Sequence, residues 1–477
     1  MPSVSEVVAL FDLGAVILLL STLVVFAVPI FILFPPIPVE RGDALRQTHS
    51  KLGISASESN LRNQTSPHHN YKPGKAATIQ SLYIYPVKSC RGIEIKHGKV
   101  SPKGLELDRL FAFAREKPGR TEAPASPGEE NSGQPRQLKK NPQWELLTLR
   151  QVPLLANVRV DLWLPDASKT SRQLGKVHGR FMVIGFPWKD SGLKGVFQWI
   201  SAKLSRGLSG FPEREFMLPI DFPSASEIQA RGYRYEDAQF FTKSIRALNM
   251  ENEVPRELGL YLGVAAPMTI FMIDPAQRRQ VLGHAPRKDD AGYQPVIDFQ
   301  DTYPLHLLSL ASIRALESKV QKDDGLKFLD ARRFRPNIIV SGLKEYDEDG
   351  WRCIEFSQPP RGAVAKGPES KFDVSCRTVR VFADGNITCH VQSRAEMIPY
   401  RCKLPNVDPA TGIRHKVEPD NSLRKYRNID GEAPKSGCFG VQLCPMFSKT
   451  IDPEDMQFLL EVGMEIEVLQ RGQHLAL

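Results

Sequence analysis

The feature that most constrains the fold of this chain is a run of 22 residues without a charged side chain, at positions 13–34. A helix of about 20 apolar residues can cross the hydrocarbon core of a bilayer, so the run predicts one transmembrane helix after a short tail at 1–12. A cleaved signal peptide is disfavoured because no Lys or Arg precedes the run and no small-x-small cleavage site is present. The first basic residues, Arg41 and Arg46, follow the run, which predicts that the body faces the cytosol.

Length and composition indicate a globular body with an ordinary surface. A chain of 477 residues predicts two folded units with appendages, and 41% hydrophobic and 25% charged residues are typical of a sizeable core. The net charge of +9 comes from Lys and Arg interleaved with Asp and Glu, which favours a solvated surface with some anion-binding positions over a nucleic-acid partner. Seven cysteines without a CxxC pair predict neither a disulfide framework nor a structural zinc site, and they favour a reducing compartment.

Changes in composition divide the chain into segments. Residues 35–76 are rich in Pro, Ser, Asn and Lys, which predicts a flexible linker. We expect a first folded unit at 77–275, with a disordered insert at 117–142 where Pro and Gly are frequent and apolar residues are rare. A second folded unit is expected at 276–471, with an unusual insert at 381–401.

The hydrophobic pattern predicts a strand-dominated α+β fold. Alternating apolar residues predict strands that begin at Ala77 and at 157–164, and further strands are predicted at 110–114, at the short apolar run 337–340 and at 464–469. Helical spacing predicts helices at 196–208 and 305–320, and residues 210–260 are interpreted as helix and loop. This pattern suits small barrels better than a doubly wound sheet.

Three segments place polar groups beside turns. Residues 85–92 read YPVKSCRG, a turn whose Lys, Ser and backbone N–H groups can bind a phosphate, although a solvated turn would look the same. Residues 332–337 read RRFRPN, which can clamp an anion or form a plain surface cluster. Residues 401–412 read RCKLPNVDPATG, where a thiolate beside Arg401 can be a metal ligand or nucleophile, or a buried packing residue.

Taken in order with four further segments, these motifs resemble those of the MOSC-domain proteins, and most closely the mitochondrial amidoxime-reducing components. The further segments are LDR at 107–109, DTYPLHLLS at 301–309, LRKYR at 423–427 and FG at 439–440. The resemblance spans roughly residues 78–469. It implies a MOSC N-terminal β-barrel domain at 77–275, a MOSC-type β-barrel domain at 276–471, and a molybdenum–molybdopterin cofactor between them.

The resemblance also implies roles for individual residues. Lys88, Ser89 and Arg109 would bind the phosphate and ring of the pterin, Arg335 and Asn337 match further cofactor-binding positions, and Cys402 would coordinate the metal. A dianionic phosphate needs cationic donors, and a soft thiolate suits molybdenum. Asp408 can hydrogen-bond near an open metal position, but a loop-ordering turn before Pro409 explains it equally well. We interpret Cys90 and Cys438 as structural, and His306 and His390 as core or loop residues.

The insert at 381–401 departs from the family pattern. CRTVR at 376–380 would join directly onto Cys402 if these 21 residues were removed. The insert is either a genuine hairpin or loop, with a DGN turn signal at 384–386, or translated non-coding sequence. A genuine insert matters because displacing a catalytic group by about 1 Å can lower a rate by roughly 100-fold.

The resemblance implies a molybdenum-dependent oxidoreductase that reduces amidoximes and hydroxylamines with electrons from NADH, delivered through a reductase and a b5-type cytochrome. The chain has no GxGxxG fingerprint, so direct NAD binding is not predicted. The resemblance favours the mitochondrial outer membrane, and the endoplasmic reticulum fits the anchor equally. Two alternatives remain: sulfur transfer or cofactor handling, as in MOSC domains fused to pyridoxal-phosphate-dependent sulfurases, and an inactive membrane-tethered binding protein.

Overall fold

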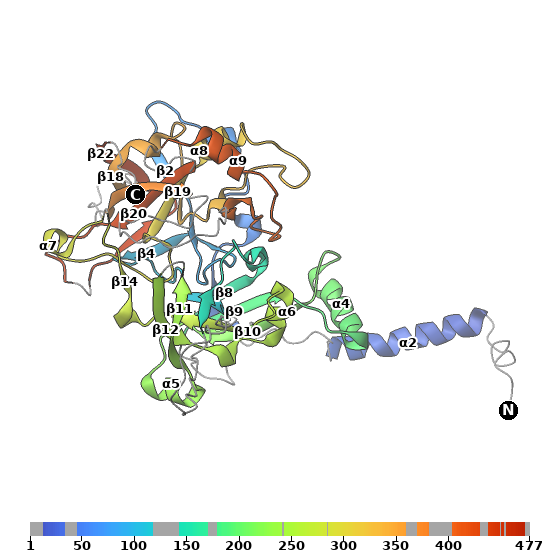
Figure 1. Cartoon of the computed structure of the whole chain (residues 1–477). Coiled ribbons are helices and arrows are strands. Elements are labelled where there is room, and N and C mark those ends of the chain that lie inside the picture. The colour runs from blue at the N-terminus through green and yellow to red at the C-terminus, as the bar shows by residue number, and fades with distance from the viewer. Residues whose placement is uncertain are drawn as a thin grey trace, which may run out of the picture.

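The structure, a computed structural model, describes most of the chain as a strand-rich body from which one helix projects (Figure 1). The described residues are 13–33, 45–117, 143–169, 179–240, 243–283, 285–358, 370–380, 403–429, 437–448, 450–452 and 455–472. The predicted disordered insert, from residue 118 on, and the predicted insert at 381–401 lie outside these residues, as do Cys402 and His390.

The largest sheet has eight strands in the order β17-β16-β20-β19-β18-β22-β2-β3. Their bounds are Ile338–Ser341, Leu305–Ser309, Gly437–Pro445, Ser370–Arg380, Trp351–Ser357, Glu465–Arg471, Ala77–Ile84 and Ile93–Ile95. Strand β17 also pairs with β2, so the sheet closes on itself. The first strand of the predicted N-terminal unit, β2, therefore belongs to the same sheet as the C-terminal strands, and it positions the turn that follows it beside them.

A second, five-stranded barrel is closed in the order β11-β12-β13-β6-β7. These strands are Arg234–Phe240, Lys243–Asn249, Met268–Met272, Phe111–Glu116 and Trp144–Leu146. One buried apolar cluster joins residues of this barrel, such as Phe113 and Ile270, to Leu307 and Val340 of the large sheet. The predicted fold class, strand-dominated with β-barrels, is confirmed.

Smaller sheets and short helices complete the body. A four-stranded sheet runs β1-β8-β9-β10, a three-stranded sheet β21-β4-β5, and β14 pairs with β15. These strands are His49–Leu52, Arg159–Pro165, Phe181–Pro187, Glu213–Pro219, Phe458–Glu461, His97–Ser101, Gly104–Leu105, Arg279–Gln280 and Val296–Ile297. The helices are α4 (Gly192–Arg206), α5 (Ala225–Arg231), α6 (Arg256–Leu262), α7 (Lys288–Ala291), α8 (Leu310–Glu317) and α9 (Asp420–Tyr426).

The prediction of a flexible linker up to residue 76 is wrong from Leu45 onward. Strand β1 pairs antiparallel with β8, with His49 opposite Pro165. Farther along, Leu61 is buried, and Gln64 Nε2 donates to Leu329 O at 2.7 Å. Pairing with an open sheet edge satisfies backbone groups without requiring hydrophobic periodicity, which is why the composition of this segment was misleading.

Two other element predictions are corrected. The predicted helix at 305–320 is strand β16 followed by α8, where Ser309 Oγ accepts from Ala311 N at 3.2 Å and caps the helix. An apolar run this short cannot be assigned to strand or helix by its periodicity. The segment 210–260, interpreted as helix and loop, does contain α5 and the start of α6, but it also contributes the three strands β10, β11 and β12.

Helix α2 (Leu13–Leu33) projects away from the body (Figure 1). In the part of the chain that the structure describes, no helix is both long enough and apolar enough to cross a membrane. The predicted transmembrane helix at 13–34 is therefore not supported by the structure.

Candidate functional site

Five predicted cofactor-binding residues line one cavity of about 70 Å³. They are Lys88, Ser89, Arg109, Arg335 and Asn337. They meet because β2 and β17 are paired, which places the turn after β2 beside the residues that precede β17. Strand β6 is held to the same turn, since Lys88 N donates to Phe111 O at 2.7 Å.

The backbone at this cavity is unusual. Ser89, Arg109 and Arg335 have φ values of 70°, 51° and 53°, in the left-handed region that residues with a Cβ rarely adopt. Two of them are held by backbone hydrogen bonds: Arg109 N donates to Tyr85 O at 2.8 Å, and Arg335 N donates to Arg332 O at 3.0 Å. Strained backbone of this kind concentrates at ligand sites, because the surrounding structure must enforce it.

Lys88 is the most buried cation of the cavity, with 8% of its side chain exposed. Its ammonium donates to Phe299 O at 2.7 Å, forms an ion pair with Asp301 and lies 4.4 Å from the centre of the Phe240 ring. Burial lowers the pKa of Lys88 to about 8, although Asp301 opposes this shift. Neighbouring protein atoms partly desolvate the Asp301 carboxyl, which opposes its ionisation, yet the Lys88 ammonium holds the pKa of that carboxyl below its usual range.

Asp301 was missed by the sequence analysis. It lies at the start of the segment DTYPLHLLS, and an acidic residue four positions before a buried strand was the available signal. Its side chain is 42% exposed, so it is the accessible half of the ion pair with Lys88. An incoming anion would therefore have to share Lys88 with this carboxylate.

Arg109 and Asn337 form the centre of a polar network. Arg109 pairs with Asp108, donates to Asn337 Oδ1 at 3.2 Å and donates to Arg335 O at 3.3 Å. Asn337 Nδ2 donates to Tyr83 O at 3.1 Å. The Asn337 amide therefore joins β2 to Arg109, which makes it a positioning group for the cation.

The Arg335 guanidinium has only some of its N–H donors hydrogen-bonded. Its guanidinium lies 4.1 Å from the centre of the Tyr85 ring and donates through Nη1 to Cys90 O at 2.8 Å. Its Nη2 is buried without a hydrogen-bond partner, which is an unfavourable state for a charged donor. An anionic ligand would satisfy this group. The donor set of Lys88, Arg109 and Arg335 fits the phosphate-bearing part of a molybdopterin.

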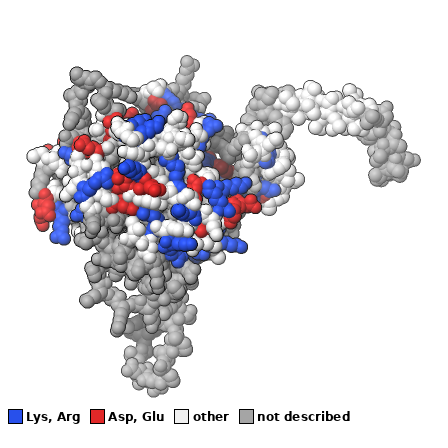
Figure 2. All heavy atoms as spheres, turned by 90° about the horizontal axis from the view of Figure 1, so that it is seen from above, with Lys and Arg blue, Asp and Glu red and all other residues white. Residues whose placement is uncertain are grey.

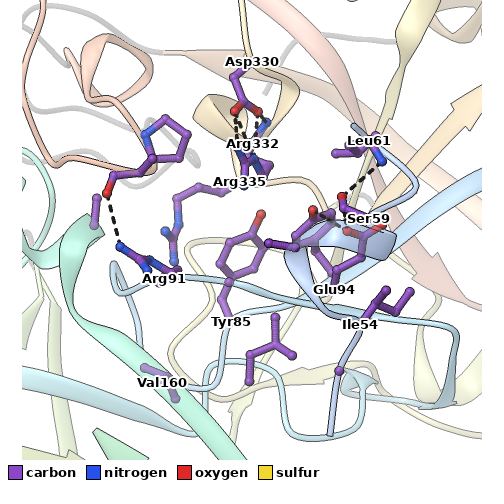
Figure 3. Close-up of a pocket in the computed structure, with 18 of the residues that line it drawn as sticks. Ile54, Ser59, Leu61, Tyr85, Arg91, Glu94, Val160, Asp330, Arg332 and Arg335 are labelled. Carbon is purple, nitrogen blue, oxygen red and sulfur yellow. Dashed lines mark hydrogen bonds and ion pairs between the residues drawn. The ribbon is translucent and has the colours of Figure 1, made fainter. Parts of the chain in front are cut away.

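A larger cavity of about 910 Å³ adjoins this site and shares Arg335 with it (Figure 3). Tyr85, Arg91 and Arg335 line the cavity together, and residues 51–56 of the N-terminal segment form another part of its wall. Several of its charges are already paired: Arg332 Nε, for example, contacts Asp330 Oδ1 at 3.0 Å. The positive charge that this cavity offers to a ligand is therefore smaller than its number of arginines suggests.

Asp408 makes the contacts of a loop-ordering residue. Its Oδ1 accepts from Ala410 N at 2.9 Å and from Thr411 N at 3.0 Å. Its Oδ2 accepts from Arg333 Nη2 at 2.8 Å, and Arg333 is almost completely buried. These contacts correspond to the turn that the sequence analysis offered as the alternative to a catalytic role, and the catalytic role stays a prediction.

We expect Asp408→Asn to lower the free energy of unfolding by about 1–3 kcal/mol, because Arg333 loses its charged partner in a buried position. The Asn side-chain oxygen can still accept from Ala410 N and Thr411 N, so kcat should be unchanged. Urea unfolding and steady-state kinetics measure the two effects. A fall in kcat with unchanged stability would instead support a catalytic carboxylate.

The cysteines singled out in the sequence differ in whether the structure describes them. Cys402, the predicted metal ligand, lies outside the described residues; the chain is described again from Lys403, and Leu404 lines the smaller cavity. Cys90 and Cys438 are fully buried, and burial raises the pKa of Cys90 to about 12, as expected of structural cysteines. No cluster of three or more His, Cys, Asp or Glu side chains suited to a metal occurs among the described residues.

Anion binding at this cavity should depend on pH through Lys88. Because its pKa is lowered to about 8, the ammonium is charged below pH 8 and neutral above it. We expect the affinity of cofactor-free protein for sulfate, whose own charge is constant here, to fall as the pH rises from 7 to 9. Calorimetric titration measures this change. Lys88→Arg should remove it, and a profile that is flat in the wild type would contradict the assignment.

Two parts of the chain match models of known domain families. The family model of the MOSC N-terminal beta barrel domain matches residues 76–174, and that of the MOSC domain matches residues 294–467. The chain is 22% identical to Mitochondrial amidoxime reducing component 2 of Rattus norvegicus, over 75% of this chain and 74% of the relative. It is also 22% identical to Mitochondrial amidoxime-reducing component 1 of Homo sapiens, over 80% and 82% respectively. Molybdenum cofactor sulfurase of Oryza sativa subsp. japonica is 24% identical, over 59% of this chain and 26% of the relative.

Proposed function

The chain belongs to the MOSC-domain family, and on that premise we propose that it is a molybdenum-cofactor oxidoreductase that reduces N-hydroxylated compounds such as amidoximes and hydroxylamines. The observation that carries the proposal is the cavity where Lys88, Ser89, Arg109, Arg335 and Asn337 meet. Relatives named as amidoxime-reducing components, which align over most of their length, support the choice of substrate class.

The residues of this cavity would have different roles in binding the cofactor. Lys88, Arg109 and Arg335 would neutralise the phosphate. Asn337 would hold Arg109 in place, because Asn337 Oδ1 accepts a hydrogen bond from Arg109 Nη1 at 3.2 Å. When bound, the cofactor supplies a molybdenum centre at which an N–O bond can be reduced by two electrons. Cys402 would be its protein ligand.

We further propose that a b5-type cytochrome and its NADH-dependent reductase deliver the electrons. The net charge of +9 would favour encounter with an acidic partner. Figure 2 shows Lys and Arg interspersed with Asp and Glu on the visible face, so no single basic patch dominates that face.

Attachment of residues 13–34 to the mitochondrial outer membrane or the endoplasmic reticulum is proposed from the sequence. Side chains of α2 such as Leu18 and Phe26 are strongly exposed, at 69% and 68%, which supports contact with lipid. Membrane fractions washed with alkaline carbonate should retain the full chain. Its complete release would contradict the anchor.

The function is tested on the purified full chain. Molybdenum close to one atom per chain, and reduction of benzamidoxime by NADH in the presence of the cytochrome and reductase, are the expected results. Protein that stays metal-free and inactive after supply of the cofactor would overturn the proposal. A matched variant without residues 381–401, which joins Arg380 to Cys402, shows what the insert does: higher activity in this variant would identify the insert as the obstacle.

A cofactor-handling role is the second candidate, because a molybdenum cofactor sulfurase is among the relatives. That protein is matched over only 26% of its length, so the similarity is confined to part of it. Transfer of labelled sulfur from the chain to a molybdenum enzyme, without reduction of benzamidoxime, would favour this candidate.

A further inference from the structure

Helix α4 carries large apolar side chains that face solvent. Leu193, Phe197 and Leu204 are 78%, 58% and 71% exposed, and Leu208, just beyond the helix, is 90% exposed. The same segment also exposes Val196, Trp199, Ile200 and Phe211. Scattered exposed apolar residues are normal, but a contiguous group of this size marks a surface that binds another protein or a membrane.

The orientation of the helix is fixed by its opposite side. Gly195, Ser201 and Ala202, all small residues, are the buried positions of α4. Gln198 Nε2 donates to Asp190 Oδ2 at 3.0 Å, and Asp190 N donates to Gln198 Oε1 at 3.0 Å. A helix that covers a protein core normally turns its large apolar side chains inward. Here the buried positions are small residues, and Gln198 is bonded to Asp190 in the loop before the helix, whereas the apolar residues at positions 193, 197, 200 and 204 are exposed.

The charged side chains of α4 are basic, although Lys194 forms an ion pair at 2.8 Å with Asp190, just before the helix. Residues 191–212 contain no Asp or Glu, whereas they contain Lys194 and Lys203. The Lys203 ammonium lies 5.4 Å from the centre of the Trp199 ring. Basic residues beside an apolar helical face are what the surface of an anionic bilayer binds, because the lysines reach the headgroups while the apolar side chains enter the acyl boundary.

The position of α4 agrees with a lipid partner. It lies at the end of the molecule from which α2 projects (Figure 1), and α2 also exposes large apolar side chains. The two apolar helices are thus presented on the same side of the body, as attachment to one surface requires.

We propose that α4 is an interfacial helix that docks on anionic phospholipid with the side chains of Leu193, Phe197, Ile200 and Leu204 embedded. This contact is additional to an anchor at 13–34 and independent of the proposed reductase activity. It would hold the body against the bilayer and restrict how the cavity at Lys88 is presented.

Hydrogen exchange measured by mass spectrometry on the full chain tests this proposal. In nanodiscs of phosphatidylcholine with phosphatidylserine, amides of residues 192–206 should exchange about tenfold more slowly than in detergent micelles. Nanodiscs of phosphatidylcholine alone should give less protection. The triple variant Leu193→Ser, Phe197→Ser and Leu204→Ser should lose the protection, and Lys194→Gln with Lys203→Gln should lose its dependence on phosphatidylserine.

Two controls separate an effect of α4 from a general loss of apolar surface or of the fold. Leu282→Ser changes an equally exposed leucine, at 66%, outside α4, and it should leave the protection unchanged. Because the substituted side chains are exposed, circular dichroism should show that the triple variant remains folded. Equal exchange in nanodiscs and micelles would overturn the proposal. Protection that instead rises with protein concentration would also overturn it, since a second copy of the chain would then cover the helix.

Discussion

Replacing Cys402 by Ala is expected to lower the rate of benzamidoxime reduction by more than about 100-fold, because even residues that only support a metal ligand contribute roughly 10–100-fold. The free energy of unfolding of the cofactor-free protein should not change. The motif RCKLPNVDPATG places this cysteine two residues before Leu404, which lines the cavity with Lys88 and Arg335. Steady-state activity and urea unfolding measure these two quantities, and the molybdenum content is measured on the same samples.

Cys90→Ala is the matched control, because it should have the opposite effects. Cys90 is completely buried, and burial raises the pKa of its thiol to about 12, so it is neither an accessible thiolate nor a metal ligand. Loss of its sulfur should lower the free energy of unfolding by about 1 kcal/mol. Its backbone oxygen, which accepts from Arg335, is unaffected by the substitution. Full activity in Cys402→Ala would refute the ligand assignment, and inactivity in both variants would leave Cys402 without a distinct role.

The parts of the site that could be predicted are those encoded in contiguous motifs. Lys88 and Ser89 are neighbours in one turn, and Arg335 and Asn337 flank Pro336, so each motif carries its donors together. The pairing of β2 with β17 then brings the two motifs to one cavity. The strands predicted at 110–114, 157–164 and 337–340 are also confirmed, within a few residues, as β6, β8 and β17.

The parts that could not be predicted depend on contacts between distant segments. Asp301 becomes a partner of Lys88 only because the fold places residues 213 positions apart together. Strand β1 forms because β8 offers an open edge, and a single sequence does not reveal which edge is open. The orientation of α4 could not be predicted for a related reason. Hydrophobic spacing predicts a helix but does not tell which side contacts the body.

Lys88→Met is expected to weaken binding of the cofactor by about 10- to 150-fold, since a hydrogen bond to a charged group contributes roughly 1.5–3 kcal/mol. Methionine has a similar length and can occupy the buried space beside Phe240. Asp301 loses its partner, but its side chain is 42% exposed and can be hydrated. The free energy of unfolding should therefore change by less than about 1 kcal/mol. Molybdenum content after expression, and titration of the cofactor-free protein, measure the loss of binding.

Asp301→Asn should act in the reverse direction, and the pair of variants separates binding from stability. It leaves the Lys88 ammonium, only 8% exposed, without its counter-charge, which should lower the free energy of unfolding by about 1–3 kcal/mol. Affinity for the cofactor should be kept, because the carboxylate no longer competes with the phosphate for Lys88. The double variant should regain stability without regaining affinity. If Lys88→Met binds the cofactor as tightly as the wild type, Lys88 serves only as the partner of Asp301, and the anion site must lie elsewhere in the cavity.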